Sequence, residues 1–345
     1  MQNLCYALCP TGAEASEIGE FMGLLVDGEW RDQWYDTKSS GGKFVRQEAQ
    51  FRDRVTADGS SGFPAESGRY HLYVSYACPW AHRTLIYRVL KGLEDHISVS
   101  VVNPLMLENG WTFEPGEGVI PDPIFGARYM HEIYTAAKPD YSGRVTVPVL
   151  WDKEQGTIVN NESSEIIRFF DSEFDEVGAS GPHFCPPELE SDIDAVNEFV
   201  YGSINNGVYK CGFATTQEAY EEAVRALFAA LDQIDLRLSG SRYLVGETLT
   251  EADWRLFTTL LRFDPVYVGH FKCNIRRLVD YPNLWAYTRE LYQVPGVAET
   301  VHMDHIKEHY YRSHGTLNPS GVVPVGPEID FPEPHGREAI GIRGG

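Results

Sequence analysis

YVSYACPWAHRTLIYRVL, residues 73–90, decides the fold of this chain, because its pattern changes from that of a strand to that of a helix. The residues before Pro79 are largely aromatic or β-branched, whereas the apolar residues after it recur at helical spacing. Proline is favoured in the first turn of a helix, so Cys78 is expected at or just outside a helix N-terminus. Unpaired backbone N–H groups and the helix dipole favour negative charge there. We therefore expect the Cys78 thiol to ionise near neutral pH.

Outward from this stretch, the pattern is that of a β-α-β unit. It predicts a strand over 70–76, a helix over 80–93 and a second strand over 97–104, which makes the sheet parallel at this point. Residues 105–142 are rich in glycine, proline and aromatic residues and show no sustained period. A loop of this length inside a compact domain is usually functional.

Two more strands and a helix are predicted after this loop. The strands are expected over 145–152 and 156–161, and the helix over 162–174. This order, β-α-β, insert, β-β-α, is that of thioredoxin. Pro148 lies within the first of these strands, where it would remove a hydrogen-bond donor from the ladder. It is either the cis-proline that faces the active-site sulfur in thioredoxin-like proteins or a trans-proline in an edge strand.

A second, helical domain is expected after a boundary at residues 184–191. The segment from Gln217 to Leu238 carries one apolar stripe. In LTEADW, Thr250 is expected to cap a helix, and Asp253 to complete the capping box. The expected organisation is an irregular N-terminal extension over 1–62, a thioredoxin-like domain over 63–180, an all-helical domain over 186–315 and an extended C-terminal tail over 316–345.

The composition argues against several classes of function. A net charge of −21 in 345 residues disfavours nucleic acid or an anionic membrane as the main partner. No apolar run approaches the length of about 20 residues that spans a bilayer, and the N-terminus shows no secretory pattern. The cysteines form no C-x-x-C pair, and Cys5 and Cys9 have no ligands nearby, so neither a disulfide framework nor a metal site is expected. We expect a protein of the reducing cytoplasm.

A helix-start cysteine in a thioredoxin-like domain, followed by an all-helical domain, resembles the cytosolic glutathione transferases. Six stretches narrow the resemblance to the Xi-class enzymes, the glutathionyl-hydroquinone reductases, and the resemblance covers about residues 24–327. They are YACPWAHR, VTVPVLWD, NNESSEIIRFF, NNGVYKCGFA, TEADWRLFTTLLRFDPVY and EHYYRSHGTLNP. The resemblance implies an α/β domain followed by an all-α domain, glutathione as cosubstrate, no tightly bound cofactor, and a homodimer formed through the helical domain.

Cys78 is the expected nucleophile of such an enzyme. Its motif, C-P-W-A, has no second cysteine at residue 81, so the thiol that resolves a mixed disulfide must come from outside, as from glutathione. His82 follows about one helical turn later, and could either polarise this thiol or lie on the helix surface. The resemblance assigns contacts with glutathione to five residues, which are Trp111, Arg144, Val147, Glu162 and Ser163.

These contacts have physical reasons, and some have alternatives. Glu162 and Ser163 open a predicted helix, where a hydroxyl and backbone N–H groups can hold a carboxylate, and a carboxylate can hold an ammonium. They could also be ordinary helix-start residues. Val147 would offer its backbone N–H and C=O to the cysteinyl part of the peptide. Arg144 and Trp111 resemble residues that contact the glycyl end and the edge of the peptide, although Trp111 could equally anchor the long loop.

Three tyrosines, Tyr209, Tyr267 and Tyr310, match tyrosines that line the electrophile pocket of the family. When a thiolate attacks the sulfur of an S-aryl glutathione, the leaving ring carbon must accept a proton, and a phenol is a suitable acid. Aromatic walls would also stack on a hydroquinone ring. The neighbouring Tyr311 is the alternative to Tyr310.

The reaction implied by the resemblance is the glutathione-dependent reductive deglutathionylation of glutathionyl-hydroquinones to hydroquinones. Cys78 would form a mixed disulfide with glutathione, which a second glutathione would release as oxidised glutathione. Two other interpretations stay open. An omega-like thioltransferase or dehydroascorbate reductase would share the cysteine chemistry without the tyrosine pocket, and a non-catalytic transferase-like module would serve protein assembly.

Overall fold

A four-stranded mixed sheet organises the first domain of the computed structural model, which describes residues 23–340. The central strand is parallel to one neighbour and antiparallel to the other, and all five of its residues are buried. The spatial order is β4 (Ser98–Val101), β3 (Tyr70–Val74), β6 (Val149–Asp152) and β7 (Thr157–Asn160).

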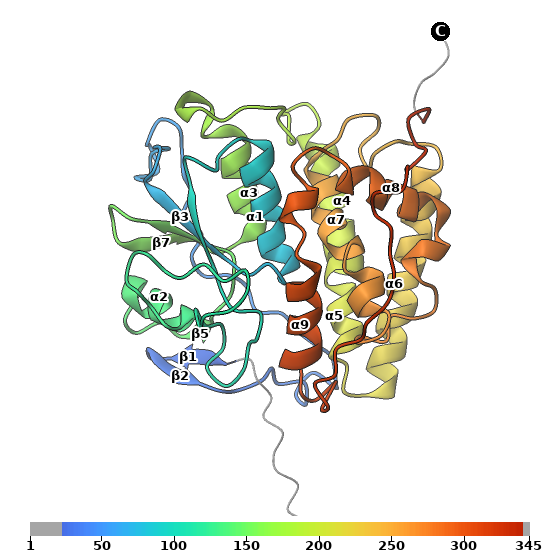
Figure 1. Ribbon diagram of the computed structural model, residues 1–345, viewed down its shortest axis with the longest axis horizontal. Helices are drawn as coiled ribbons and strands as arrows, with labels where there is room; N and C mark the ends of the chain where they lie inside the picture. Colours follow the sequence, from blue (N-terminus) through green and yellow to red (C-terminus); the bar gives the residue numbers. More distant parts are fainter. Residues whose placement is uncertain (1–22, 341–345) are drawn as a thin grey trace, which may run out of the picture.

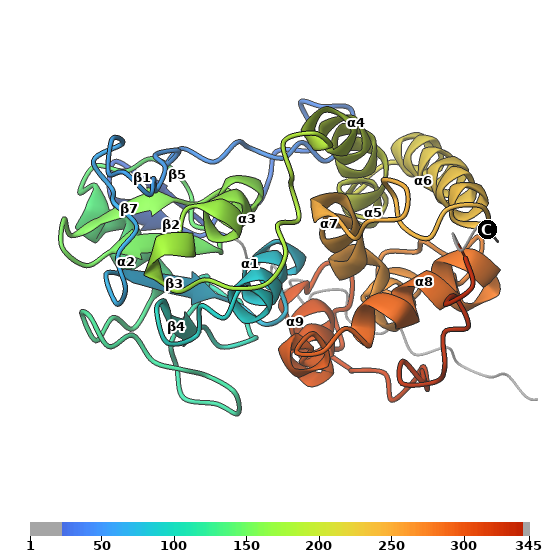
Figure 2. The same ribbon diagram turned by 90° about the horizontal axis from the view of Figure 1, so that it is seen from above.

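Two helices cover the face of this sheet that looks toward the second domain (Figures 1 and 2). α1 (Pro79–Leu90) follows β3 and packs along α3 (Ser163–Ser172). The predicted β-α-β and β-β-α units are therefore both present, and the thioredoxin-like fold of this domain is confirmed. The peptide between Val147 and Pro148 is cis and immediately precedes β6, so the first interpretation of Pro148 is correct.

The long insert contains a helix that its composition did not reveal. α2 (Met130–Ala137) begins at a capping box formed by Tyr129 and Glu132, so residues 105–142 are not one continuous loop. Its buried side chains, Met130, Ile133 and Tyr134, have helical spacing but occupy only two turns. A segment this short, between stretches rich in glycine and proline, shows no sustained period.

The N-terminal segment also contains regular structure. β1 (Leu24–Val26) and β2 (Glu29–Arg31) form a hairpin, and β1 pairs with β5 (Gly143–Arg144) in a second, three-stranded sheet. The expectation of an irregular extension over residues 1–62 is therefore wrong for this hairpin. Strands of two or three residues are too short to show an alternating pattern, and they are defined by the pairing of β1 with β2 and with β5.

The second domain is helical and lies beside the first (Figures 1 and 2). Thr216 caps its longest helix, which spans the predicted residues, and the predicted capping box of Thr250 and Asp253 starts another. Among residues 23–340, no helix is long and apolar enough to cross a membrane. After the turn η1 (Asp175–Val177), the helices are α4 (Glu190–Val200), η2 (Tyr201–Asn205), α5 (Gly207–Gly212), α6 (Gln217–Leu238), α7 (Glu251–Leu260), η3 (Phe263–Tyr267), η4 (Leu278–Asp280), α8 (Pro282–Tyr292), η5 (Ala298–Thr300) and α9 (Met303–Ser313).

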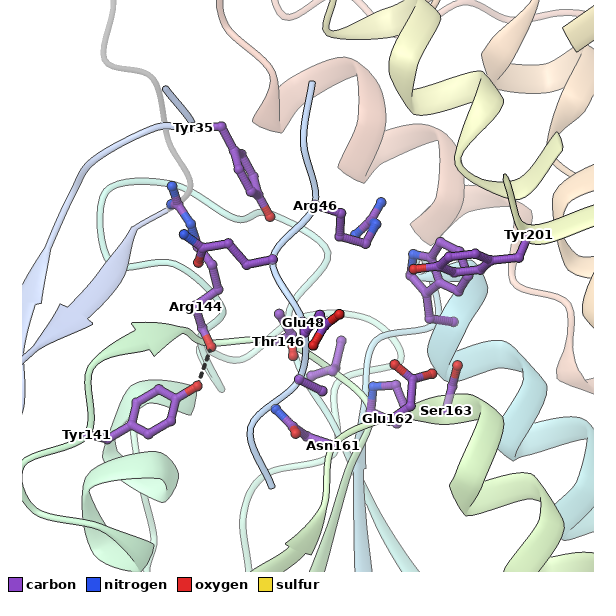
Figure 3. A pocket seen from close by; sticks show the side chains of 15 residues that line it. Tyr35, Arg46, Glu48, Tyr141, Arg144, Thr146, Asn161, Glu162, Ser163 and Tyr201 are labelled. Carbon is purple, nitrogen blue, oxygen red and sulfur yellow. Dashed lines mark hydrogen bonds between the residues drawn. The ribbon is translucent and has the colours of Figure 1, made fainter. Parts of the chain in front are cut away.

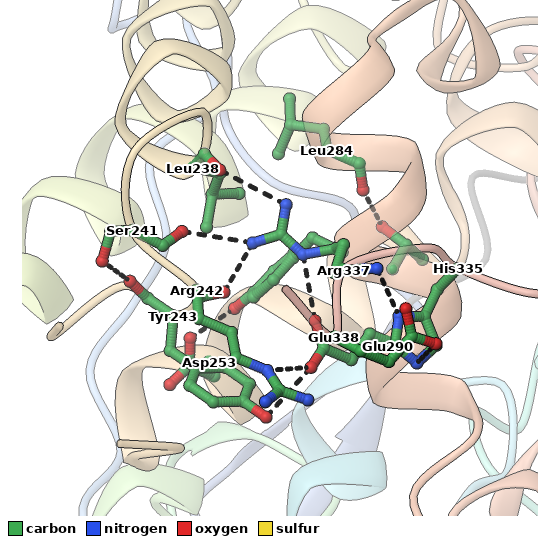
Figure 4. A network of polar contacts seen from close by, with 12 residues as sticks. Leu238, Ser241, Arg242, Tyr243, Asp253, Leu284, Glu290, His335, Arg337 and Glu338 are labelled. Carbon is green, nitrogen blue, oxygen red and sulfur yellow. Dashed lines mark hydrogen bonds and ion pairs between the residues drawn. The ribbon is translucent and has the colours of Figure 1, made fainter. Parts of the chain in front are cut away.

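Residues 314–340 form no helix or strand and run along the helical domain; we call them the C-terminal strap. Arg337, near its end, is buried and donates from Nε to Glu290 of α8 at 3.0 Å (Figure 4). Phe331 stacks on Tyr292 with ring centroids 5.0 Å apart. The strap is therefore held against α8 at both of these residues.

Candidate active site

Cys78 is the residue that caps the N-terminus of α1, as the sequence predicts. Its backbone is extended, with φ −75° and ψ 121°, and Pro79 occupies the first turn of the helix. The thiol donates to the carbonyl oxygen of Val147, with Sγ 3.5 Å from that oxygen. The loop that contains the cis-proline thus faces the sulfur, and the residue is partly accessible to solvent.

Burial raises the pKa of the Cys78 thiol above its ordinary value, although several groups oppose this effect. The backbone N–H groups of Ala81 and Trp80 and the positive charges of Arg262 and Arg46 all lower the pKa. Burial is the largest of these influences. The direction of this shift opposes the expectation of a thiol that ionises near neutral pH, because that expectation considered the helix N-terminus and not the burial of the sulfur.

A buried arginine of the helical domain holds the backbone that carries Cys78. Arg262 donates from Nε to the carbonyl of Ala77 at 2.9 Å and from Nη2 to that of Tyr76 at 3.1 Å. Its Nη1 lies 3.1 Å from His82 Nδ1, and His82 Nε2 lies 2.7 Å from Thr300 Oγ1. Since both ring nitrogens are occupied and the ring is buried, His82 neither lies on the surface nor faces the thiol as a base. Burial also holds its pKa well below the ordinary value.

An open cavity lies next to Val147, whose carbonyl the Cys78 thiol contacts (Figure 3). Arg144, Val147, Glu162 and Ser163 line it, so the structure brings four of the five expected glutathione-binding residues together. On α3, Glu162 is the N-cap and accepts from the backbone N–H of Ser164 at 3.0 Å. It is thus a helix-start residue and a wall of the cavity at once.

Arg144 and the expected fifth residue, Trp111, are both held by neighbours. Arg144 lies over the ring of Tyr35 at 4.1 Å and donates from Nη1 to the carbonyl of Gln33 at 2.6 Å. Trp111 stacks on His309 of α9, with ring centroids 4.7 Å apart, and lines a second cavity that Cys78 also lines. It therefore anchors the insert to α9 and also faces the site.

The three tyrosines form a hydrogen-bonded row in the second domain. The hydroxyl of Tyr310 lies 2.6 Å from that of Tyr209 and 3.2 Å from that of Tyr267. Tyr209 and Tyr310 line the second cavity, whereas Tyr267 is fully buried behind them. Tyr267 therefore does not line this cavity itself, and its hydroxyl contacts that of Tyr310, which does; its part in the electrophile pocket stays a prediction. Tyr311 instead donates to the carbonyl of Pro265 at 3.2 Å and is not part of this wall.

Among the three phenols, Tyr209 has a pKa that depends directly on the thiol and on two nearby arginines. Burial raises the pKa of all three phenols. For Tyr209, a hydrogen bond from Tyr310 and the charges of Arg46 and Arg262 act in the opposite direction and lower the pKa. The negative charge of an ionised Cys78 would raise it, so the thiol and this phenol affect each other directly. A phenolate at Tyr209 would therefore receive support from the row behind it.

Comparisons with known proteins agree with this geometry. The model of the glutathione S-transferase N-terminal domain matches residues 77–173, and that of the C-terminal domain matches residues 217–290. The chain is 58% identical over 324 residues to the glutathionyl-hydroquinone reductase YqjG of Escherichia coli (strain K12), across 92% of this chain and 99% of that protein. It is also 58% identical over 311 residues to the glutathionyl-hydroquinone reductase PcpF of Sphingobium chlorophenolicum, across 90% and 98% of the two chains.

Comparison with solved structures indicates the class within the transferase family. The chain matches the Xi-class transferase of Natrialba magadii with a TM-score of 0.87 at 51% identity, across 93% of this chain and 98% of that one. This chain belongs to the Xi class of glutathione transferases. A glutathione-bound structure of YqjG matches this Xi-class chain with a TM-score of 0.85 at 54% identity, across 91% and 99% of the two chains.

The sequence patterns missed four residues of the Xi-class site. Trp80 and Arg46 line both cavities, Tyr35 packs on Arg144, and Arg262 holds the cysteine loop. Two of the four, Tyr35 and Arg46, come from the N-terminal segment, which shows no periodic pattern. An arginine two positions after an aromatic residue, as in KFVRQ, was the available signal, and it is too common to point to a site.

Among residues 23–340, no group of three or more His, Cys, Asp or Glu side chains could hold a metal ion. The pair Cys5 and Cys9, for which no metal site was expected, lies outside the described residues.

Proposed function

We propose that this chain reduces glutathionyl-hydroquinones to hydroquinones, with glutathione as cosubstrate and no resident cofactor. One observation supports this most strongly: the Cys78 thiol and the hydrogen-bonded phenols of Tyr209 and Tyr310 share one cavity. A nucleophilic sulfur and an acid for a carbon leaving group are the two functions that the reaction needs. The names of the two relatives that are 58% identical describe this activity.

Glutathione would lie across the first cavity. Its γ-glutamyl end would meet Glu162 and Ser163 at the N-terminus of α3, where backbone N–H groups favour a carboxylate. Its cysteinyl part would pair with the backbone of Val147, beside the thiol. Its glycyl end would point toward Arg144 and Trp111, which lie on the wall nearest the N-terminal segment.

The first half of the reaction forms a mixed disulfide. The Cys78 thiolate attacks the glutathionyl sulfur, a sulfur–sulfur bond forms, and the bond between sulfur and the ring carbon breaks. The electron pair of the broken bond remains on the ring carbon, which takes the proton of the Tyr209 hydroxyl. The products are hydroquinone, a Tyr209 phenolate stabilised by the hydroxyl of Tyr310, and Cys78 joined to glutathione.

The second half restores the enzyme. The thiolate of a second glutathione attacks the outer sulfur of the mixed disulfide, and oxidised glutathione leaves while Cys78 departs as a thiolate. The proton of this second glutathione returns to Tyr209. Overall, one glutathionyl-hydroquinone and one glutathione give one hydroquinone and one oxidised glutathione.

We further propose that the chain acts in the cytoplasm as a homodimer formed through the helical domain. Glutathione keeps thiols reduced in that compartment, as the reaction requires. Exposed apolar side chains on α4, η2 and α6, which are Phe199, Tyr201 and Leu236, give the helical domain an apolar surface suited to a second copy. Light scattering coupled to size-exclusion chromatography measures this state, and a monomer would contradict it.

The central test is substitution of the nucleophile. Cys78→Ala is expected to lower turnover of glutathionyl-menadiol about a thousandfold or more, because no other described cysteine lines the cavity. Intact mass spectrometry during turnover should find one glutathione attached to the wild-type chain and none on the variant. Cys185→Ser, which changes another partly exposed cysteine, is the matched control and should retain both signals.

Two results would contradict the proposal. Turnover by the Cys78→Ala variant would exclude the mixed disulfide. Disulfide exchange without any reduction of glutathionyl-menadiol by the wild-type chain would instead favour an omega-like thioltransferase.

A further inference from the structure

Arg46 extends from the N-terminal segment into the cavity that Cys78 lines. Figure 3 shows it on the irregular segment that crosses in front of the glutathione cavity, opposite Glu162 and Ser163. The residue lines the glutathione cavity and also the cavity that contains Cys78 and the tyrosines. It thus occupies the junction between the two substrates' expected positions.

The guanidinium of Arg46 lies among aromatic rings. Its Cζ atom is 4.9 Å from the centroid of Trp80, 4.8 Å from that of Tyr209 and 5.4 Å from that of Phe44. Trp80 follows the cysteine by two residues, and Tyr209 is the proposed acid. These distances place the positive charge beside the ring of Tyr209, in the cavity that Cys78 also lines.

Within residues 23–340, Arg46 forms no ion pair with a carboxylate, although Glu48 and Glu162 line the glutathione cavity with it. Arg46 makes one hydrogen bond, from Nε to Asn206 Oδ1 at 2.9 Å, and no ion pair. Its Nη2 nitrogen is buried without a hydrogen-bond partner. The residue as a whole is half-buried, and a partly desolvated guanidinium with an unused donor favours a negative charge that forms nearby.

The other charged or titratable groups around the sulfur cannot take this role as readily. Arg262 is already occupied by the carbonyls of Tyr76 and Ala77, and Arg144 by Tyr35 and the carbonyl of Gln33. Burial lowers the pKa of His309 to about 4 and that of His314 well below its ordinary value, so both rings are neutral at pH 7. Tyr209 and Tyr310 are neutral phenols whose pKa burial raises.

We propose that Arg46 stabilises the negative charge of the reaction as it moves between Cys78 and Tyr209, an inference that rests on the proposed function. The charge is on the thiolate before the attack. When the bond between sulfur and the ring carbon breaks and the carbon takes the proton of Tyr209, the charge is on the phenolate. One guanidinium beside both groups serves both states without moving. In agreement with this, the charge of Arg46 lowers the pKa of both groups.

Docking of the N-terminal segment onto the helical domain does not depend on Arg46 alone. The backbone N–H of Thr215 donates to the carbonyl of Gly42 at 3.0 Å. Lys43 and Glu222 form an exposed ion pair at 2.8 Å. Neighbouring substitutions can therefore separate a loss of docking from a loss of charge.

The test measures the thiol and turnover separately in four variants. Alkylation of Cys78 by iodoacetamide, resolved by peptide mass spectrometry across pH, needs no hydroquinone substrate. Arg46→Gln should move the midpoint of this profile upward by about one pH unit and lower kcat for glutathionyl-menadiol about 10- to 100-fold. Arg46→Lys, which keeps a cation, should remain close to the wild type in both measurements. Lys43→Gln is the control on the same segment and should change neither.

Asn206→Ala removes the hydrogen bond of Arg46 but not its charge. A loss of kcat shared by Arg46→Gln and Asn206→Ala with an unchanged alkylation profile would overturn the inference, because it would show docking alone. An unchanged profile in Arg46→Gln overturns it in any case. If the wild type failed to reduce glutathionyl-menadiol while the profile still moved, the proposed function would fail and the effect on the thiol would stand.

Discussion

Two side chains, Cys78 and Tyr209, must ionise during the proposed reaction in a place that disfavours ions. Burial raises the pKa of both, and the structure offsets this with the N–H groups at the start of α1 and the charges of Arg262 and Arg46. The thiolate is the reactive form of the sulfur. The rate of chemistry at Cys78 is therefore set by how far these neighbours compensate for burial.

The pH dependence of the thiol follows from this balance. A raised pKa means that the thiolate fraction, and with it the alkylation rate, keeps increasing with pH above neutrality. We expect the rate of iodoacetamide alkylation at Cys78 to rise still further between pH 8 and about 9, without a plateau at pH 7. Cys185, whose pKa burial raises to about 12, should react more slowly at every pH in this range. A plateau near pH 7 would show that the helix N-terminus prevails over burial.

The row of tyrosines predicts a graded series of effects on kcat. Tyr209→Phe removes the proposed acid and should lower kcat for glutathionyl-menadiol about 100-fold. Tyr310→Phe removes the hydroxyl that supports the phenolate and should lower kcat about 10-fold. Tyr267→Phe removes a hydroxyl that contacts Tyr310 and should lower kcat about 2- to 3-fold. Tyr311→Phe is the control, since its hydroxyl bonds elsewhere. Equal losses at all three positions would mean that the row acts only as an apolar wall.

At the scale of the element, α7 has a capping box at its N-terminus and is followed by a residue that holds the active-site loop. Its N-terminus is held by Asp253, which accepts from the backbone of Thr250 at 2.8 Å and of Leu244 at 2.9 Å, and from the hydroxyl of Tyr287 at 2.6 Å. Two residues after its C-terminus comes Arg262, which holds the cysteine loop. A misplaced α7 would therefore move the backbone of Cys78.

Loss of the α7 capping box should lower the free energy of unfolding considerably. Asp253→Ala leaves several buried donors unpaired and should lower the free energy of unfolding by about 3 kcal/mol. Asp280→Ala removes a similar cap from an exposed turn and should have a much smaller effect. Urea denaturation followed by tryptophan fluorescence measures both. Similar midpoints for the two variants would refute the assignment of α7 as a critical element.

At the scale of the whole molecule, the C-terminal strap runs along the helical domain and is held to it by Arg337. Besides its contact with Glu290, Arg337 donates to the carbonyls of Leu238 at 3.3 Å, Ser241 at 3.2 Å and Arg242 at 2.6 Å (Figure 4). One side chain thus links the end of α6, the following turn and α8. The strap is extended, but its guanidinium is 2% exposed and belongs to the core.

Removal of this link should destabilise the protein without changing its chemistry. Arg337→Ala removes the donor of one oxygen of Glu290, whose other oxygen keeps Arg242 and Tyr243, and of three carbonyls; it should lower the free energy of unfolding by about 3 kcal/mol. Glu333→Gln breaks an exposed ion pair of the same strap with Arg289 and should have little effect. Thermal unfolding and kcat measured together distinguish the outcomes. A drop in kcat at a temperature where the Arg337→Ala variant is fully folded would contradict a purely structural role.

Local patterns carried much of the fold. The apolar stripe from Gln217 to Leu238 became α6 within those bounds, and Thr250 with Asp253 started α7. By contrast, α2 and the hairpin at Leu24–Arg31 remained hidden, because elements of eight residues or fewer show too few repeats. Such elements exist because the rest of the molecule packs against them.

The sequence by itself determined the thioredoxin-like order of elements, the place of Cys78 at a helix start and the class of chemistry. Prolines, caps and apolar repeats act over a few neighbouring positions, and a family motif is a local string. Only the tertiary structure decided that Arg46 lies beside the reacting groups, that Tyr267 stands behind Tyr310, and that His82 binds Arg262 and Thr300. Burial and charge at these positions depend on residues far apart in the chain, which meet only when the two domains pack together.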